Sequence, residues 1–440
     1  MPRSVSLLQT IAVSVGITIG SGIFRVPATV AAQLQAPRAM LLCWVLGGVI
    51  ALCGALTVAE LAGALPRSGG IFAYLLEAYG PLPAFLFGWT ELVVVRAAAL
   101  GAIATIFAEY LGYFLPLSAR QVRCTAALAI VLVGALNYVG VQRAARVLSA
   151  ATAVKYAVLL ALGLLAFSAR GGSVAHLSAA PAAPVPPWLL ASALIPVMWT
   201  YDGWADASAV AGEIRDPQRN LPLALIAGAL CVMLVYLVVN VGFLYALAPA
   251  QMAQSKLIAA TVAARIPLLG AAGAALVTAA VVVSAFSSLH ASMLTGSRVF
   301  FAMADRGLFL RAAARVSARF NTPSVAIALA SGLGVAYVLE NDFAQLAGKF
   351  ILGIWPFYAL TVAAVFVLRR RRPTLPRPYR VWGYPWVPAL FLLASAFLVL
   401  NALYTDPRNT GITFIIILAG LPVFWLRRRV LRAAPVSLHE

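Results

Sequence analysis

The sequence predicts an all-α integral membrane protein with twelve membrane spans in a single transmembrane domain over residues 1–440. Three observations predict this class: the chain is 63% hydrophobic, only 10% of its residues are charged, and its mean hydropathy is +0.95. A soluble globule of 440 residues could not bury so much apolar surface, so lipid must cover part of it. Apolar runs of about 20 residues, each long enough for a ~30 Å hydrocarbon core, recur along the whole chain.

The apolar runs place the spans in order along the sequence. We expect them at residues 5–32, 39–63, 82–112, 122–140, 150–169, 187–214, 221–247, 268–303, 323–339, 344–368, 386–404 and 410–428. The segments between these spans are too short to form a soluble domain. The first run lacks the small-residue cleavage site of a signal peptide, so we expect a retained helix.

The formal charge of +19 would suggest a nucleic acid partner in a soluble protein, so the position of the cations matters. If the N-terminus is cytoplasmic, most of the 32 lysine and arginine residues fall in cytoplasmic loops. This bias predicts a multi-pass protein of the plasma membrane, the inner membrane in a bacterium, with both termini cytoplasmic. We expect the arginine run at 369–372 to meet phospholipid headgroups, and we expect no nucleic acid partner.

Cysteine and histidine usage argues against a cofactor, a metal or an enzyme. The four cysteines lie in or at the ends of apolar spans without CxxC spacing, which is typical of packing residues. The three histidines are scattered, and the sequence contains neither HExxH nor GxxxxGK[ST]. We expect His290 to be a packed, hydrogen-bonded residue. Because no nucleophile with a matching base can be picked out, we expect no catalysis and no cofactor.

Two spans contain residues that interrupt a membrane helix. The glycine-rich stretch GITIGSGIF at 16–24 lies in the first span, and YDGWAD at 201–206 lies in the sixth. Backbone polar groups in a bilayer must be satisfied, so a helix break at mid-membrane is tolerated only where it lines a buried cavity. Two such breaks, each in the first helix of a five-helix unit, point to inverted repeats with a substrate site between them.

The breaks suit a zwitterion. Unwinding frees backbone N–H groups at the start of one half-helix, which attract a carboxylate, and carbonyl groups at the end of the other, which attract an ammonium. The alternative interpretation is that Gly16, Gly20 and Gly22 only allow close helix packing. The acidic Asp202 inside the membrane favours a binding site.

Two motifs resemble the amino acid-polyamine-organocation superfamily, and within it bacterial members of the L-amino acid transporter family. They are GSGIF in the first span and YDGWADASAVAGEIRDPQRNLPLAL from Tyr201 to Leu225. Further matches follow in order along the chain: PRSGGIFAYLLEAYG, WTELVVVRAA, SAFSSLHASMLTGSRVFFAM and GITFIIILAGLPVF. The resemblance implies a LeuT-like fold with inverted repeats at 5–169 and 187–368, discontinuous first and sixth helices, and two peripheral helices within 386–428.

The same resemblance implies roles for residues at the breaks. The N–H groups of Ser21 and Gly22 would take the substrate carboxylate, and the carbonyls of Thr18 and Trp199 would take its amino group. Trp199 would also be an aromatic gate. The implied substrate-binding set is Thr18, Gly20, Ser21, Gly22, Trp199, Tyr201, Asp202, Gly203 and Trp355.

Lys155 lies in the apolar stretch ATAVKYAVLLALGLL. A lone ammonium among apolar residues costs several kcal/mol, so it needs partners. The resemblance places it where sodium-coupled relatives hold an ion, beside Gly16 and a serine of the eighth span, which is Ser284, Ser287 or Ser288. A fixed cation there would replace sodium. The alternatives are that Lys155 snorkels to a headgroup or carries a proton.

Three further charged residues lie within the spans or at the breaks. We expect Arg25 to pair with Asp202 or Asp206, or to face the outer vestibule. Glu91 and Arg96 are five residues apart, so an α-helix would not stack them on one face. We expect Glu91 to anchor a buried network.

These features lead to one main functional hypothesis and several alternatives. The main one is a sodium-independent exchanger of neutral L-amino acids that works by alternating access and recognises the substrate through backbone groups. A polyamine or cationic amino acid transporter, with or without proton coupling, is the second, because Glu91, Asp202 and Asp206 could face a polycation. A membrane sensor is a third alternative, but it would need an output domain, and the spans leave none. An ion channel is a fourth, and its currents would exceed the turnover rate of a carrier. The expected partners are an amino acid and the bilayer. The resemblance implies no heavy-chain subunit, because this sequence has no cysteine in the loop between spans three and four, through which animal members of the family bond such a subunit.

Overall fold

The described part of the protein is entirely helical, which confirms the all-α class. The computed structural model describes residues 5–66, 70–139, 144–179, 184–206, 208, 214–305, 315–317, 319–320 and 322–433. Within these ranges the only β-type pairing is an isolated parallel bridge between Val5 and Ile214. This bridge joins the segment before α1 to the last residue of the sixth expected span, Ile214.

Eight helical stretches in the described ranges are long and apolar enough to cross a membrane. They are Pro37–Ala64 (α3), Pro81–Leu111 (α5, Pro81–Thr90; η2, Glu91–Arg96; α6, Ala97–Leu111), Ala119–Val139 (α7), Pro217–Ala246 (α11), Gly273–Gly296 in α14 (Gly273–Asp305), Phe343–Arg371 (α16), Trp386–Thr405 (α17) and Pro407–Leu426 (α18, Pro407–Leu418; α19, Gly420–Ala433). They confirm a multi-pass membrane protein.

The other four expected spans correspond to shorter or divided helices, so the count of twelve stays a prediction. The first span is divided into α1 (Leu7–Thr18) and α2 (Val26–Leu34), and the sixth begins with α10 (Pro187–Tyr201). The fifth and ninth correspond to α8 (Ala144–Leu165) and α15 (Ser324–Glu340). Most of residues 207–213, in the second half of the sixth expected span, lie outside the described ranges.

The connecting segments carry short helices. They are α4 (Gly70–Tyr79), α9 (Ala175–Ser178), α12 (Pro249–Gln254), α13 (Ile258–Ala263) and the 3-10 turns Gly22–Phe24, Ala166–Ser168 and Pro267–Leu269. Several begin with proline, whose fixed φ and missing N–H suit the first turn of a helix.

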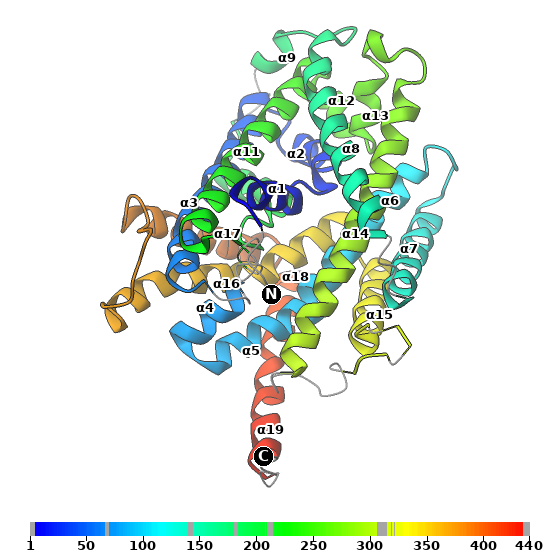
Figure 1. Cartoon of the computed structure of the whole chain (residues 1–440). Coiled ribbons are helices and arrows are strands. Elements are labelled where there is room, and N and C mark those ends of the chain that lie inside the picture. Colours follow the sequence, from blue (N-terminus) through cyan, green and yellow to red (C-terminus); the bar gives the residue numbers. More distant parts are fainter. Residues whose placement is uncertain are drawn as a thin grey trace.

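The helices pack in two groups around the divided segments (Figure 1). In one group α3, α10 and α11 pack together, with α1 against α11 and α2 against α10. In the other, α6, α7, α14 and α15 pack together. Helix α8 contacts both α11 and α14, and α16 contacts both α10 and α6, so these two helices join the groups.

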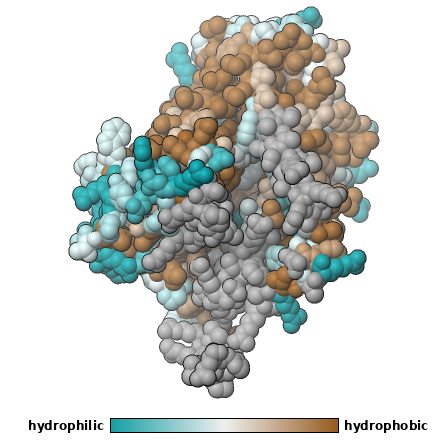
Figure 2. All heavy atoms as spheres, viewed as in Figure 1, coloured by the Kyte–Doolittle hydropathy of each residue, from teal (hydrophilic) through white to brown (hydrophobic). Residues whose placement is uncertain are grey.

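Hydrophobic side chains cover most of the upper part of the face shown in Figure 2, as expected of a lipid-facing surface. Large apolar side chains on the outward faces of the long helices are exposed, such as Leu128, Leu234 and Leu400. Hydrophilic residues gather at one side of this view, where the segment between α16 and α17 lies in Figure 1.

That polar segment is fixed to the bundle by the buried carboxylate of Glu60 at the end of α3. Glu60 accepts hydrogen bonds from Arg369 Nε at 2.9 Å, from Arg369 Nη2 at 2.6 Å and from the backbone N–H of Val381 at 2.7 Å. Arg372 forms an ion pair with Glu77. Two members of the arginine run therefore neutralise carboxylates of the protein itself, where we had expected the run to meet lipid headgroups.

Candidate functional site

The first helix breaks where its glycine-rich stretch predicts. Helix α1 ends at Thr18, the N–H of Ile19 still donates to Val15, and a 3-10 turn begins at Gly22. The backbone between them is not helical, because the N–H of Gly20 turns back to the carbonyl of Thr18 at 2.8 Å. A Cβ atom added at Gly20 would meet no atom within 4 Å, so this backbone faces open space.

The second break lies directly against the first. Helix α10 ends at Tyr201, Asp202 is extended, and Gly203 has a φ of +105° that side chains rarely adopt. A Cβ atom at Gly203 would lie 3.0 Å from Ile17 Cγ2 and 3.1 Å from Thr18 Cα. Glycine is therefore required here both by the backbone conformation and by the close approach of α1.

The two breaks also meet at Gly22. A Cβ atom there would lie 2.8 Å from a ring carbon of Trp199 and 3.1 Å from Thr200 Oγ1. The Trp199 ring packs edge-on against Phe343 of α16, with ring centroids 5.3 Å apart. The Trp199 ring therefore lies between Gly22 of the first break and Phe343 at the start of α16.

Tyr236 of α11 connects the ends of the two half-helices. Its hydroxyl lies 3.2 Å from the carbonyl oxygen of Thr18 and 3.0 Å from that of Thr200, so its single O–H is shared between the two acceptors. The side chain is fully buried. We did not select Tyr236 from the sequence, although a tyrosine within an apolar span needs a hydrogen-bond partner for its hydroxyl.

We expect Tyr236→Phe to raise the apparent KM for the substrate by about fivefold, because the loss of one buried hydrogen bond costs about 1 kcal/mol. Without it the two half-helix ends are no longer held together. Kinetics of substrate uptake by purified protein in liposomes measure this. Tyr79→Phe is the matched control, since that hydroxyl donates to the carbonyl of Leu360 at 2.9 Å, between α4 and α16 and away from the breaks. An equal rise in KM in both variants would contradict a specific role for Tyr236.

Several buried polar atoms of the helices at or around the first break have no hydrogen-bond partner among the described residues, and one in α14 has none either. They include Ser21 Oγ at the first break, Ser14 Oγ in α1, Tyr156 Oη in α8 and Ser284 Oγ in α14. Buried polar atoms in proteins are nearly always hydrogen-bonded, so each unpaired one needs an explanation. Ser21 lies next to the open space at Gly20, where a small polar solute could satisfy it.

Lys155 is buried, with only 5% of its surface exposed. Its Nζ atom lies 5.1 Å from the centroid of the Tyr156 ring, and Tyr156 Oη lies 3.1 Å from where a Cβ atom of Gly16 would stand. The alternative that Lys155 snorkels to a headgroup is therefore wrong. Its pairing with Gly16 or a serine stays a prediction: Ser284 and Ser287 are buried in α14, which packs against α8, and Ser288 is half-buried.

Two aromatic residues of the predicted set point into helix interfaces. The hydroxyl of Tyr201 reaches Trp44 of α3, and the Trp355 ring stacks on Phe391 of α17 with centroids 5.4 Å apart. Both side chains are almost fully buried. These contacts favour packing roles, so substrate contact at Tyr201 would involve its backbone.

The side chain of Asp202 is held by α16. It accepts a hydrogen bond of 2.7 Å from the hydroxyl of Tyr358. One turn later Asp206 is exposed, and its carboxylate lies within electrostatic range of Glu91 and Arg96. The second break therefore carries two acids: Asp202 is hydrogen-bonded to the protein, and Asp206 is exposed.

Arg25 pairs with Glu109 of α6, at 2.9 Å between Nε and Oε2. The guanidinium also donates to Thr29 at 3.1 Å and lies over the Phe343 ring, 5.4 Å from its centroid. The alternative that Arg25 pairs with Asp202 or Asp206 is therefore wrong, because its carboxylate partner is Glu109. Glu109 is 84 residues further along the chain, and no sequence pattern linked the two.

Glu91 and Arg96 form an ion pair even though they are five residues apart. The reason is that η2 is a π-helical segment, in which residues i and i+5 lie one turn apart. Arg96 Nη1 also donates to Ser292 Oγ of α14 at 3.0 Å. The expected buried network at Glu91 is present, but the assumption of α-helical geometry was wrong.

His290 matches the structural role that we expect for it. One ring nitrogen lies 3.1 Å from the side-chain nitrogen of Asn137 in α7, so the residue is half-buried and hydrogen-bonded between α7 and α14.

The two ends of the broken first helix differ in exposure. Around α2, Phe24 is buried and its carbonyl accepts a 2.6 Å hydrogen bond from the buried hydroxyl of Tyr110. On α1, Val13 and Ile17 are 39% and 44% exposed. The α2 side of the first break is therefore closed by packing, whereas these apolar side chains of α1 lie on the surface.

Comparison with known proteins identifies the family. The family model for amino acid permeases matches residues 5–425. The chain belongs to the amino acid permease family. It is 30% identical to the serine/threonine exchanger SteT of Bacillus subtilis over 430 residues, which is 97% of each chain. It is 31% identical over 433 residues to the human b(0,+)-type amino acid transporter 1, covering 97% of this chain and 88% of the relative.

A third relative is the human cystine/glutamate transporter, which is 30% identical over 445 residues, covering 97% of this permease and 85% of the relative. These findings confirm the resemblance to the amino acid-polyamine-organocation superfamily and its L-amino acid transporter family.

Proposed function

We propose that this permease is a sodium-independent antiporter that exchanges neutral L-amino acids across the plasma membrane. The single observation that carries the proposal is the pair of facing helix breaks, with open space at Gly20 and the unpaired Ser21 Oγ beside it. A relative that is similar over 97% of both chains is a serine/threonine exchanger. Serine is therefore the first substrate to test.

The chemistry of the breaks suits both charged groups of an amino acid. The first N–H groups of a helical turn have no acceptor within the turn, so those of Ser21 and Gly22 are suited to the substrate carboxylate. The carbonyls of Thr18 and Trp199 at the ends of the half-helices are suited to the ammonium. Because the Thr18 carbonyl already accepts from the N–H of Gly20 and from the hydroxyl of Tyr236, the ammonium would replace the longer, 3.2 Å bond from Tyr236. Recognition by backbone atoms leaves the substrate side chain free, which allows several amino acids to be accepted.

We assign the present structure to an inward-facing state of a LeuT-like alternating-access cycle. The closed side carries the contact of Trp199 with Phe343 and the ion pair of Arg25 with Glu109. Ile17 of α1 and Asp206 after the second break are exposed. Movement of α1, which packs mainly on α11, together with separation of Arg25 from Glu109, would reverse the accessibility.

The proposal of sodium independence rests on Lys155. A buried ammonium next to Tyr156, whose hydroxyl lies close to Gly16 of α1, supplies a fixed positive charge beside the broken helix. A sodium ion at the same place would be repelled by that charge.

The charged residues favour a neutral substrate over a polyamine. Two of the three carboxylates that a polycation would need are already engaged, since Asp202 accepts from Tyr358 and Glu91 pairs with Arg96. Only Asp206 remains accessible among them. Excess putrescine should therefore leave serine uptake unchanged.

Uptake by the purified chain in liposomes tests the proposal. Labelled serine outside should enter much faster when the liposomes are preloaded with serine than when they are empty, and equally in sodium chloride and choline chloride. Because only this chain is present, activity would also support function without a heavy-chain subunit. An uptake rate that does not depend on internal serine, or that requires sodium, would contradict the proposed sodium-independent exchange.

A further inference from the structure

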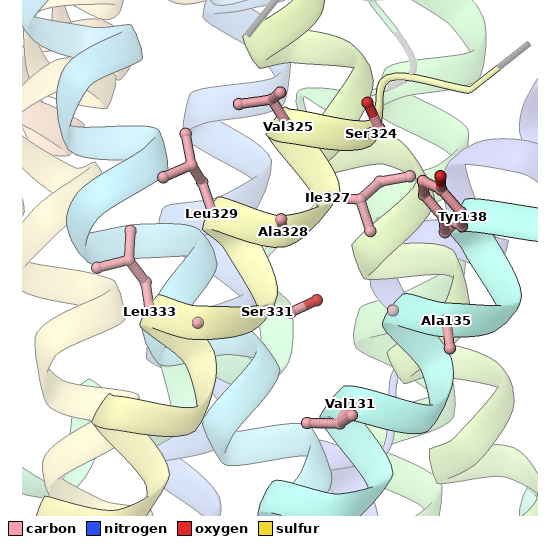
Figure 3. Close-up of a pocket in the computed structure, with 12 residues that line it drawn as sticks. Val131, Ala135, Tyr138, Ser324, Val325, Ile327, Ala328, Leu329, Ser331 and Leu333 are labelled. Carbon is pink, nitrogen blue, oxygen red and sulfur yellow. The ribbon is translucent and has the colours of Figure 1, made fainter. Parts of the chain in front are cut away.

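An apolar groove lies between α7 and α15, away from the breaks. Its volume is about 840 Å³ (Figure 3). Ile327 and Ser331 point from α15 toward α7, and Val131 and Tyr138 line the α7 side. Since α7 and α15 form part of the outer surface of the helical group, the groove opens toward lipid.

Small residues form the floor and walls of the groove. A side chain at Gly134 would collide with Ser331 Oγ, so the glycine lets the two helices approach each other closely. Ala135 and Ala328 line the groove and are exposed, so their methyl groups leave room above the floor. The result is an open apolar groove.

The length of the groove corresponds to one leaflet of a bilayer. Its α15 side runs from Ser324 to Leu333, which is about 14 Å along a helix and roughly half of a ~30 Å hydrocarbon core. An extended acyl chain of one leaflet fits this length.

The end of the groove near Tyr138 and Ser324 is cationic. The Tyr138 ring packs edge-on against Phe320 at 5.4 Å, and the guanidinium of Arg319 lies over the Phe320 ring, 5.1 Å from its centroid. Arg315 is exposed in the same segment. The N-terminus of α15 adds a partial positive charge at this end.

We propose that this groove binds one acyl chain of an anionic phospholipid, whose headgroup pairs with Arg319 and Arg315. Tyr138 lies at the level where aromatic side chains meet headgroups. The loop that carries both arginines belongs to the side predicted to be cytoplasmic, where the leaflet is anionic. The apolar length of the groove matches the acyl chain of a lipid, and its cationic end matches an anionic headgroup.

Native mass spectrometry of the purified permease tests this site. The protein is mixed with equal amounts of phosphatidylglycerol and phosphatidylcholine of identical chains, and the bound lipids are counted. We expect several-fold more phosphatidylglycerol than phosphatidylcholine on the wild type. The double variant Arg315→Gln/Arg319→Gln should bind both lipids equally, and Ala328→Phe should lose one bound lipid of either class.

Two matched variants control for general effects of charge and bulk. Arg120→Gln removes an exposed cation at the opposite end of α7, and Leu128→Phe adds an aromatic ring on an exposed position of α7 outside the groove. Both should bind lipid like the wild type. An unchanged lipid preference in the double arginine variant would overturn the proposal. It would also be overturned if Ala328→Phe converted a dimer to a monomer with no loss of lipid, which would assign the groove to a second copy of the chain.

Discussion

Gly203→Ala is expected to lower the rate of serine exchange by about tenfold or more. The positive φ alone costs an alanine roughly 1–2 kcal/mol, and 1.4 kcal/mol corresponds to a factor of ten. The added methyl group would also lie 3.0 Å from Ile17 and 3.1 Å from Thr18, so it would push the two breaks apart. Exchange by purified protein in preloaded liposomes measures the effect, and thermal unfolding in detergent shows whether the variant is folded.

Gly171→Ala is the matched control for that variant. Gly171 has a φ of +75°, and a Cβ atom there would meet no atom within 4 Å. It therefore adds a similar backbone strain without disturbing the breaks, and exchange should stay near the wild-type rate. If folded Gly203→Ala protein transports as fast as Gly171→Ala protein, the close contact of the breaks is not required for transport.

The second large effect is expected at Lys155. Lys155→Ala should reduce exchange by about thirtyfold, because a desolvated contact of a cation with an aromatic ring, such as that of Lys155 with Tyr156, is worth about 2 kcal/mol. The positive charge that stabilises the broken helix near Gly16 would be lost, together with the packing of the side chain on Tyr156. Initial rates of exchange measured with and without sodium show the size of the loss.

Lys256→Ala is the control, since this lysine is exposed and its removal should leave the rate unchanged. Lys155→Arg keeps the charge in a larger group and should retain more activity than the alanine variant. Wild-type exchange rates in folded Lys155→Ala protein, with or without sodium, would show that this cation has no part in the cycle.

The sequence was most informative where lipid imposes strict rules. The close-spaced glycines at 20 and 22 and the acid and glycine at 202–203 stand out within apolar spans, and both helices break at these residues because a break in the bilayer is tolerated only at a buried cavity. The long apolar helices were predictable for the same reason. The boundaries of the divided spans were less predictable, because hydropathy does not show where a half-helix ends.

The contacts that hold the breaks in place were not predictable from one sequence. Tyr236 follows Thr18 by 218 residues, and their pairing depends on how α11 packs on α1. The pairing of Arg25 with Glu109 depends in the same way on the packing of distant helices. Because local patterns report only local neighbours, such pairs appear only when the fold is known.

The ion pair of Glu91 with Arg96 shows a different kind of error. The two residues are close in sequence, so a pattern could have linked them, but the rule applied was that of an α-helix. The wider turn of the π-helical segment η2 changes which residues are neighbours. No composition signal in ELVVVR distinguished this segment from an ordinary helix.

A structure determined with serine bound would test the central claim most directly. The proposal predicts the serine carboxylate within hydrogen-bond distance of the N–H groups of Ser21 and Gly22, and its ammonium at the carbonyl of Thr18. Serine bound at the side chains of Asp202 and Asp206, with residues 19–22 making no contact to it, would contradict recognition by the broken helices.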